Sequence, residues 1–107
     1  MDELNEIETA CFQIIAFVGT AKSHFIEAMR AAGMGAFEEA DSLMLQGAEE
    51  FQKGHDIHFG LMRREASGVD KVPFSFILMH AEDQMMSAET IQVMAQNNID
   101  MLRARTV

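Results

Sequence analysis

The apolar residues of this chain recur every three or four positions through three segments of about thirty residues each. This spacing, kept over several heptads, predicts amphipathic α-helices that pack along a seam. Glycine or proline interrupts the pattern near residues 33–35 and 66–73. Because only short loops fit between the segments, the sequence predicts an all-α fold of three long antiparallel helices, at roughly 2–32, 36–66 and 74–104, in a single domain spanning 1–107.

The first two segments each carry one predicted seam, and Gly33 and Gly68 suit the helix ends. The first seam comprises Leu4, Ile7, Cys11, Ile14, Val18, Ala21, Phe25 and Ala28. The second comprises Phe37, Ala40, Met44, Ala48, Phe51, His55, His58 and Met62.

The third segment carries two seams, and Pro73 suits its first turn. One is apolar and suited to the other two helices: Phe74, Leu78, Ala81, Met85, Ala88, Ala95, Ile99 and Leu102. The other mixes apolar and polar residues: Ile77, His80, Gln84, Ser87, Ile91, Met94, Asn98 and Met101. Because mixed seams are typical of oligomers with a fixed register, we expect a homo-oligomer with its third helices innermost.

Charge and composition exclude several classes of function. The formal net charge of −9 argues against nucleic acid or an anionic membrane surface as a partner, and fits a basic or apolar partner surface. The single cysteine, Cys11, forms no internal disulfide and lies on the apolar seam, so we expect a buried hydrophobe. The N-terminus lacks the features of a signal peptide and no apolar run approaches about 20 residues, so we expect a cytoplasmic protein.

The stretch FSFILMHAEDQMMSA, residues 74–88, places polar residues inside an apolar run. On a helix, His80, Asp83 and Gln84 share one side at i, i+3 and i+4. An imidazole beside a carboxylate is costly to bury unless both are partnered, so this stretch is the first candidate site. His80 is either a seam histidine or a nucleophile that takes a group covalently and passes it on. For Asp83 we favour a buried polar role over a surface one.

The other histidines are weaker candidates. His55 and His58 stand at i, i+3 and could ligate a metal, but no Glu-x-x-His sequence occurs, so a structural or rim role is favoured. His24 is expected to be an exposed polar residue. Two further hypotheses therefore remain: a non-catalytic helical interaction module in which His80 and Asp83 fix the register, and a stand-alone metal-binding bundle.

The third segment also resembles a known family, the lactose/cellobiose (chitobiose) type enzyme IIA of the bacterial sugar phosphotransferase system. The family's His-Ala/Val-Gln-Asp-His-Leu-Met block is similar to residues 80–86, His-Ala-Glu-Asp-Gln-Met-Met. The run from Ile14 to Ser23 resembles the family's Ile-Ile-x-x-x-Gly-x-Ala-Arg/Lys-Ser. Residues 37–40, 54–57 and 65–68 also match, so the resemblance spans nearly the whole chain in register.

The resemblance implies a homotrimer of three-helix subunits and a phosphotransfer activity. It implies that His80 accepts a phosphoryl group from the phosphocarrier protein HPr and that the group passes to a cysteine of a IIB component. It further implies that Asp83 from three subunits binds one divalent metal, such as Mg²⁺, on the three-fold axis. Three converging carboxylates would repel unless a cation or shared protons held them together.

Two positions depart from the family pattern: Glu82 stands for its Gln, and Gln84 for its second His. We treat both as neighbours of the His80 ring. An ionised Glu82 would repel a phosphoryl oxygen, or it could accept a hydrogen bond from the imidazole and fix its tautomer. Gln84 keeps a hydrogen-bond donor but loses a titratable ring. The sequence leaves the role of Glu82 open, and it does not name the sugar.

Overall fold

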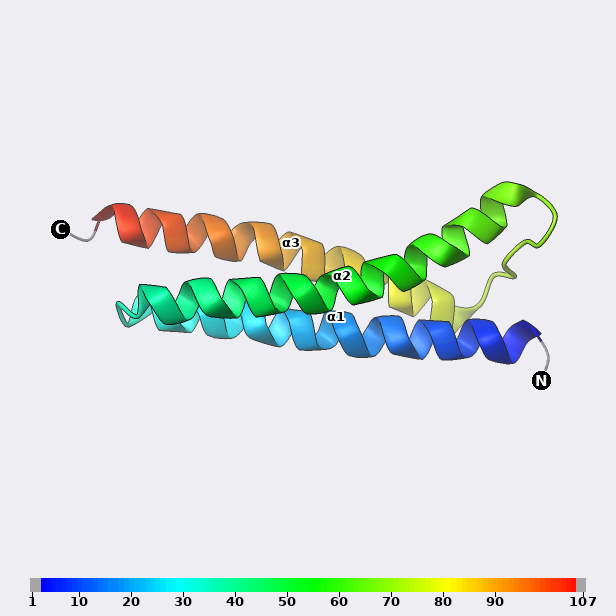
Figure 1. Cartoon of the computed structure of the whole chain (residues 1–107), viewed down its shortest axis with the longest axis horizontal. Helices are drawn as coiled ribbons and strands as arrows, with labels where there is room; N and C mark the ends of the chain where they lie inside the picture. Colours follow the sequence, from blue (N-terminus) through cyan, green and yellow to red (C-terminus); the bar gives the residue numbers. More distant parts are fainter. Residues whose placement is uncertain (1–2, 106–107) are drawn as a thin grey trace.

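The computed structural model contains three long helices, α1 (Glu3–Gly33), α2 (Phe37–Ser67) and α3 (Phe76–Arg105) (Figure 1). It describes residues 3–105, with side chains from residue 6, so the predicted start at residue 2 and the side chain of Leu4 lie outside the described part. The helices run along a body of 57 × 22 × 19 Å. The prediction of an all-α fold with three long helices is confirmed.

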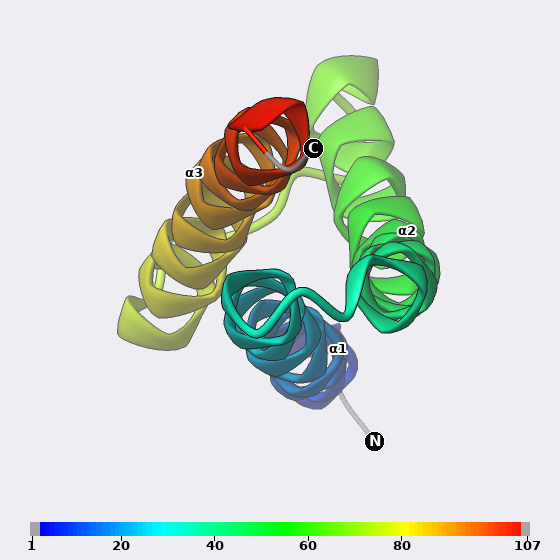
Figure 2. The ribbon, with the colours of Figure 1, turned by 90° about the vertical axis from the view of Figure 1, so that its left-hand side faces the viewer.

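The central element of the fold is α1, which packs against both other helices, whereas α2 and α3 contact one another much less. Viewed along the long axis, the three helices form a triangle (Figure 2). The last part of α2 diverges from α1 and α3 before the chain turns back (Figure 1). The described seam of α1, Ile7 to Ala28, is fully buried, as the heptad spacing predicts.

Glycines end the first two helices. Gly33 is the last residue of α1, and Gly35 turns the chain toward α2 with φ 80°. Gly68 caps α2 with φ 74°, and its N–H donates to the Glu65 carbonyl at 3.2 Å. Both positive φ angles lie in the left-handed region, which a residue without Cβ adopts at little cost.

Helix α3 begins at Phe76, two residues later than predicted. The Ser75 hydroxyl accepts a hydrogen bond from the Leu78 N–H at 3.2 Å, and the Ser75 carbonyl accepts one from the Met79 N–H at 3.1 Å. Ser75 is therefore an N-cap, and the placement of Pro73 in the first turn was wrong. Phe74, expected on the apolar seam, is 77 % exposed ahead of the helix.

The second seam differs from the prediction because glycines replace side chains at the contact with α1. The buried residues of α2 are Ala40, Met44, Gly47, Phe51, Gly54 and Leu61. Ala48 is only half-buried, and His55 and Met62 are exposed. A Cβ at position 47 would lie 2.5 Å from Cε1 of Phe25, and one at position 54 would lie 3.0 Å from Cγ1 of Val18. These two glycines thus let the larger side chains of α1 fill the space between the helices.

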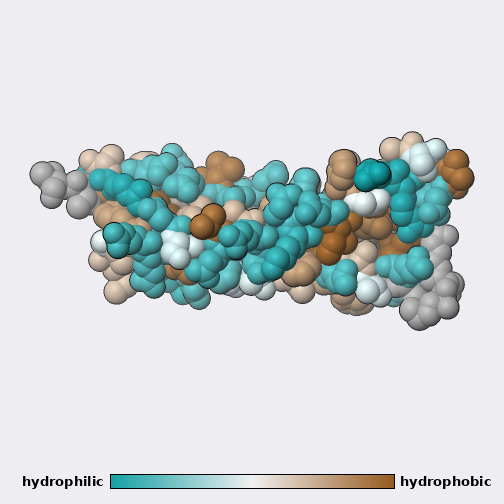
Figure 3. Space-filling view, in the orientation of Figure 1, coloured by the Kyte–Doolittle hydropathy of each residue, from teal (hydrophilic) through white to brown (hydrophobic). Residues whose placement is uncertain are grey.

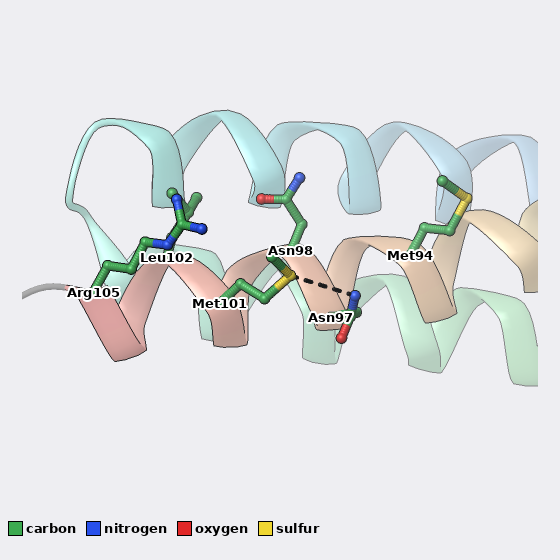
Figure 4. Close-up of a pocket in the computed structure, with 6 residues that line it drawn as sticks. All are labelled: Met94, Asn97, Asn98, Met101, Leu102 and Arg105. Atoms are coloured by element: carbon green, nitrogen blue, oxygen red, sulfur yellow. Dashed lines mark hydrogen bonds between the residues drawn. The ribbon is translucent and has the colours of Figure 1, made fainter.

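The two seams of α3 have different environments. On the apolar seam, Ala81, Ala88, Ala95 and Ile99 are buried. On the mixed seam, His80, Met94, Asn98 and Met101 are exposed in the single chain. Near the C-terminal end, this face carries a hollow of about 320 Å³ lined by Met94, Asn97, Asn98, Met101, Leu102 and Arg105 (Figure 4). Asn97 Nδ2 donates to Met101 Sδ there at 3.7 Å.

Exposed apolar side chains also gather at the divergent end of the molecule, where α2 runs into the 68–75 loop (Figure 3). The large apolar residues exposed at this end are Phe59, Met62, Val69, Phe74, Phe76 and Met79. Several exposed apolar side chains at one end form a surface suited to another protein.

The close packing at Gly47 yields a stability prediction. We expect Gly47→Ala to lower the free energy of unfolding by about 1–3 kcal/mol, because the new methyl group would overlap the Phe25 ring. Gly60→Ala is the matched control, since Gly60 lies in the same helix with nothing within 4 Å of an added Cβ. That variant should gain up to about 1 kcal/mol from helix propensity. Urea unfolding of both variants measures the difference, and equal stability would contradict the packing argument.

Candidate functional site

The candidate site lies in the second turn of α3, where His80 is exposed one helical turn before Gln84, the residue whose side chain contacts Lys22 of α1. Within residues 3–105, the His80 ring makes no hydrogen bond or ion pair. Asp83, one turn further on, is also exposed in the single chain, so the buried role expected for it is not found within one subunit. Gln84 is half-buried. The three side chains share one side of α3, as their spacing requires.

Glu82 lies on the other flank of α3, because two residues correspond to about 200° around a helix. Its Oε2 is 2.8 Å from Nε2 of His58 on α2, with side-chain exposures of 48 % and 15 %, respectively. Within one chain, the carboxylate therefore faces α2 and pairs with His58. A structural role for His58 agrees with the rim role favoured from the sequence.

His55 and His58 have separate surroundings in the fold. His55 is exposed and packs beside Phe51, with 6.3 Å between the ring centroids, whereas His58 binds Glu82. Among the described residues of the single chain, no cluster of three or more His, Cys, Asp or Glu side chains could hold a metal ion.

Lys22 is a residue of the site that the sequence pattern alone does not reveal. Its Nζ donates a hydrogen bond to Oε1 of Gln84 at 2.7 Å, from α1 to α3, at a partly buried position. Gln84 follows His80 by one helical turn, so this contact lies on the His80 flank. The available signal was the lysine in the run from Ile14 to Ser23, but the spacing alone does not show which α1 side chains face α3.

His24 corrects a further expectation. It is half-buried rather than exposed, and its Nδ1 is buried without a hydrogen-bond partner among the described residues. The physical reason is the central position of α1, which has neighbours on two sides and therefore covers residues beside its seam as well as on it.

Cys11 is a buried structural residue, as predicted. Burial raises the pKa of its thiol above the ordinary value of 9.0, and the carboxylates of Glu82 and Glu8 raise it further. The thiol thus remains protonated at neutral pH and has little nucleophilic character.

Known proteins match this chain over nearly its full length. A family model described as PTS system, lactose/cellobiose specific IIA subunit, matches residues 9–103. The oligo-β-mannoside-specific EIIA component of Bacillus subtilis (strain 168) is 33% identical over 94% of this chain and 90% of its own length. The lactose-specific EIIA component of Lactococcus lactis subsp. lactis is 33% identical, over 86% and 87%.

Solved structures agree with these relatives. The cellobiose-specific enzyme IIA from Bacillus anthracis superimposes with a TM-score of 0.87 and 32% identity, over 97% of this chain and 92% of that one. PtcA from S. mutans gives a TM-score of 0.90 with 26% identity, over 96% and 99%. The fold and the matches first define a class: an all-helical phosphotransferase component.

More particularly, the chain belongs to the lactose/cellobiose-specific IIA family of the phosphotransferase system, whose members are phosphoryl carriers for sugars of that type. The resemblance seen in the sequence is thereby confirmed. In residues 3–105, no helix is long and apolar enough to cross a membrane.

The pairing of Glu82 with His58 can be tested without an activity assay. We expect Glu82→Gln to shift the NMR signals of the His58 ring and to leave those of the His80 ring in place, because the carboxylate lies on the flank away from His80. The loss in stability should be about 1 kcal/mol or less, as for other partly exposed ion pairs. Movement of the His80 signals would instead make Glu82 a neighbour of that ring in the assembled protein.

Proposed function

We propose that His80 is the phosphoryl acceptor of this carrier, that HPr is its donor, and that the group then passes to a cysteine of a IIB component in the cytoplasm. The observation that carries this proposal is an exposed imidazole that makes no hydrogen bond or ion pair within residues 3–105, one helical turn from Gln84, which contacts the Lys22 ammonium of α1. The other histidines fit less well. His58 is paired with Glu82, His24 is half-buried, and His55 lies on α2, with its Nδ1 4.0 Å from Asp56 Oδ1.

The chemistry needs two in-line displacements at phosphorus. A ring nitrogen of neutral His80 attacks with its lone pair, so that the N–P bond forms as the bond between phosphorus and HPr breaks. The IIB thiolate then attacks the same phosphorus, an S–P bond forms, and the N–P bond breaks with its electron pair returning to the ring. His80 ends unchanged, and positioning with charge stabilisation supplies the catalysis.

We also propose that the working unit is a homotrimer with α3 innermost. Support comes from the exposed mixed seam, including Met94 and Met101, and from the hollow along it. Asp83 points outward on α3, about 60° around the helix from His80. Three copies of this carboxylate, rather than one chain alone, would make an oxygen-only site that suits Mg²⁺. When bound, the ion would neutralise the converging carboxylates.

The acceptor is tested by intact mass after incubation with phosphoenolpyruvate, enzyme I and HPr. The wild-type protein should gain one phosphoryl group, and His80→Gln should gain none, because the amide has no nucleophilic nitrogen. His55→Gln is the matched control, since it removes another exposed imidazole and should still be phosphorylated. A folded wild-type trimer without any mass gain would instead support the interaction module.

The metal is tested by elemental analysis of the purified protein beside its assembly state. We expect about one Mg²⁺ per trimer in the wild type and none in Asp83→Asn, because the amide carries no charge to hold the ion. Asp83→Asn should remain a trimer in sedimentation, since the repulsion between carboxylates disappears together with the metal. A monomeric wild type, or unchanged metal in Asp83→Asn, would contradict the proposed axial site.

A further inference from the structure

Phosphorylation of His80 creates a local problem of charge. The phosphoryl group brings about two negative charges to a chain whose formal net charge is already −9. The Asp83 carboxylate lies one turn further along the same side of α3. Like charges that are close together disfavour the charged product unless a cation lies nearby. A positive side chain on the His80 flank would therefore change the free energy of the phosphorylated form directly.

Lys22 lies on that flank. It is half-buried on α1, and its ammonium is held at 2.7 Å by Oε1 of Gln84. The Cβ atoms of His80 and Gln84 lie about 5–6 Å apart, because the two residues are one helical turn apart. Gln84 accepts one of the three N–H groups of the ammonium, which leaves the other two for oxygen atoms held by the ring.

The partner of Lys22 distinguishes it from other cations of this chain. Lys53, Arg64 and Arg103 each contact a carboxylate, that of Glu50, Asp70 and Asp41, respectively. Lys22 is instead held by the neutral amide of Gln84. The amide fixes the position of the ammonium without cancelling its charge, so the positive field remains available at the flank of His80.

We propose that Lys22, positioned by Gln84, binds the phosphoryl group on His80 and stabilises the phosphorylated form. This inference rests on the proposed function of His80. It assigns separate roles to two residues: Lys22 supplies the charge at the phosphoryl oxygens, and Gln84 acts through Lys22 as a positioning residue.

The experiment measures the equilibrium between phospho-HPr and this protein, using purified phospho-HPr and intact mass to determine all four species. The equilibrium constant depends only on the free and phosphorylated end states, so a change in the docking of HPr would alter the rate without altering this ratio. We expect Lys22→Met to lower the constant about tenfold, on the order of the effect of removing one nearby positive charge in a partly solvated site.

Three further variants separate charge from structure. Lys22→Arg keeps the charge and should restore the constant to within about threefold of wild type, the difference reflecting the geometry of the guanidinium. Gln84→Glu keeps Lys22 and an oxygen that holds its ammonium, but the new carboxylate offsets the positive charge. The constant should therefore fall at least as far as in Lys22→Met. Lys53→Met is the control, because it removes a lysine of α2 whose ammonium lies over the ring of Phe17, a residue on another face of α1. This variant should leave the constant within about twofold of wild type.

The outcomes separate this inference from the proposed function. A lowered constant in Lys22→Met and Gln84→Glu, with the arginine variant restored and melting unchanged, supports the role of Lys22. An unchanged constant in Lys22→Met, while His80→Gln accepts no phosphate, overturns that role and leaves His80 as the acceptor. An unchanged constant in Gln84→Glu would also overturn the role of Lys22, because the constant would then not depend on the positive charge of the ammonium. If the wild type takes no phosphate at all, the proposed function fails first.

Discussion

The rest of the structure depends on the close approach of α1 and α2 at Gly47 and Gly54. Without a Cβ at these positions, Phe25 and Val18 of α1 fill the interface, and the apolar seam of α1 is fully buried. A helix packed on two sides fixes the rotation of α3 as well, because α3 is held mainly by α1. That rotation decides which α3 side chains face α1, which face α2 and which remain exposed. The chemistry of the site is therefore set by packing some distance from His80.

The rotation of α3 divides its polar residues between two flanks. Glu82 turns toward α2 and contacts His58, whereas Gln84 contacts Lys22 of α1 and His80 lies one turn before Gln84. The replacement of the family's glutamine by Glu82 consequently places its negative charge away from the His80 ring within the subunit. Within one chain the carboxylate contacts His58, and its place beside the His80 ring in the assembled protein stays a prediction.

Periodicity predicted the helices and the α1 seam because burial on a helix repeats with its turn. The same periodicity misplaced the second half of the α2 seam, because it considers only apolar side chains. Gly47 and Gly54 have no side chain and are buried where α2 comes close to α1. Periodicity also missed the Ser75 cap, a local hydrogen bond that overrides Pro73 as a start signal. The Lys22–Gln84 contact joins residues 62 positions apart, and its prediction requires the relative rotation of two helices.

The partner of Lys22 is a neutral amide, and this matters for a carrier that must release the phosphoryl group it accepts. A free carboxylate near His80 would weaken the phosphorylated form, and a fully exposed lysine would be hydrated and screened by salt. In the role proposed for Lys22, an ammonium that is held by an amide at a half-buried position is not paired with a carboxylate and loses part of its hydration, so it would attract the phosphoryl group with a moderate free energy. Moderate stabilisation would suit the proposed relay from HPr to a IIB component, because a group bound too tightly would not pass to the next nucleophile.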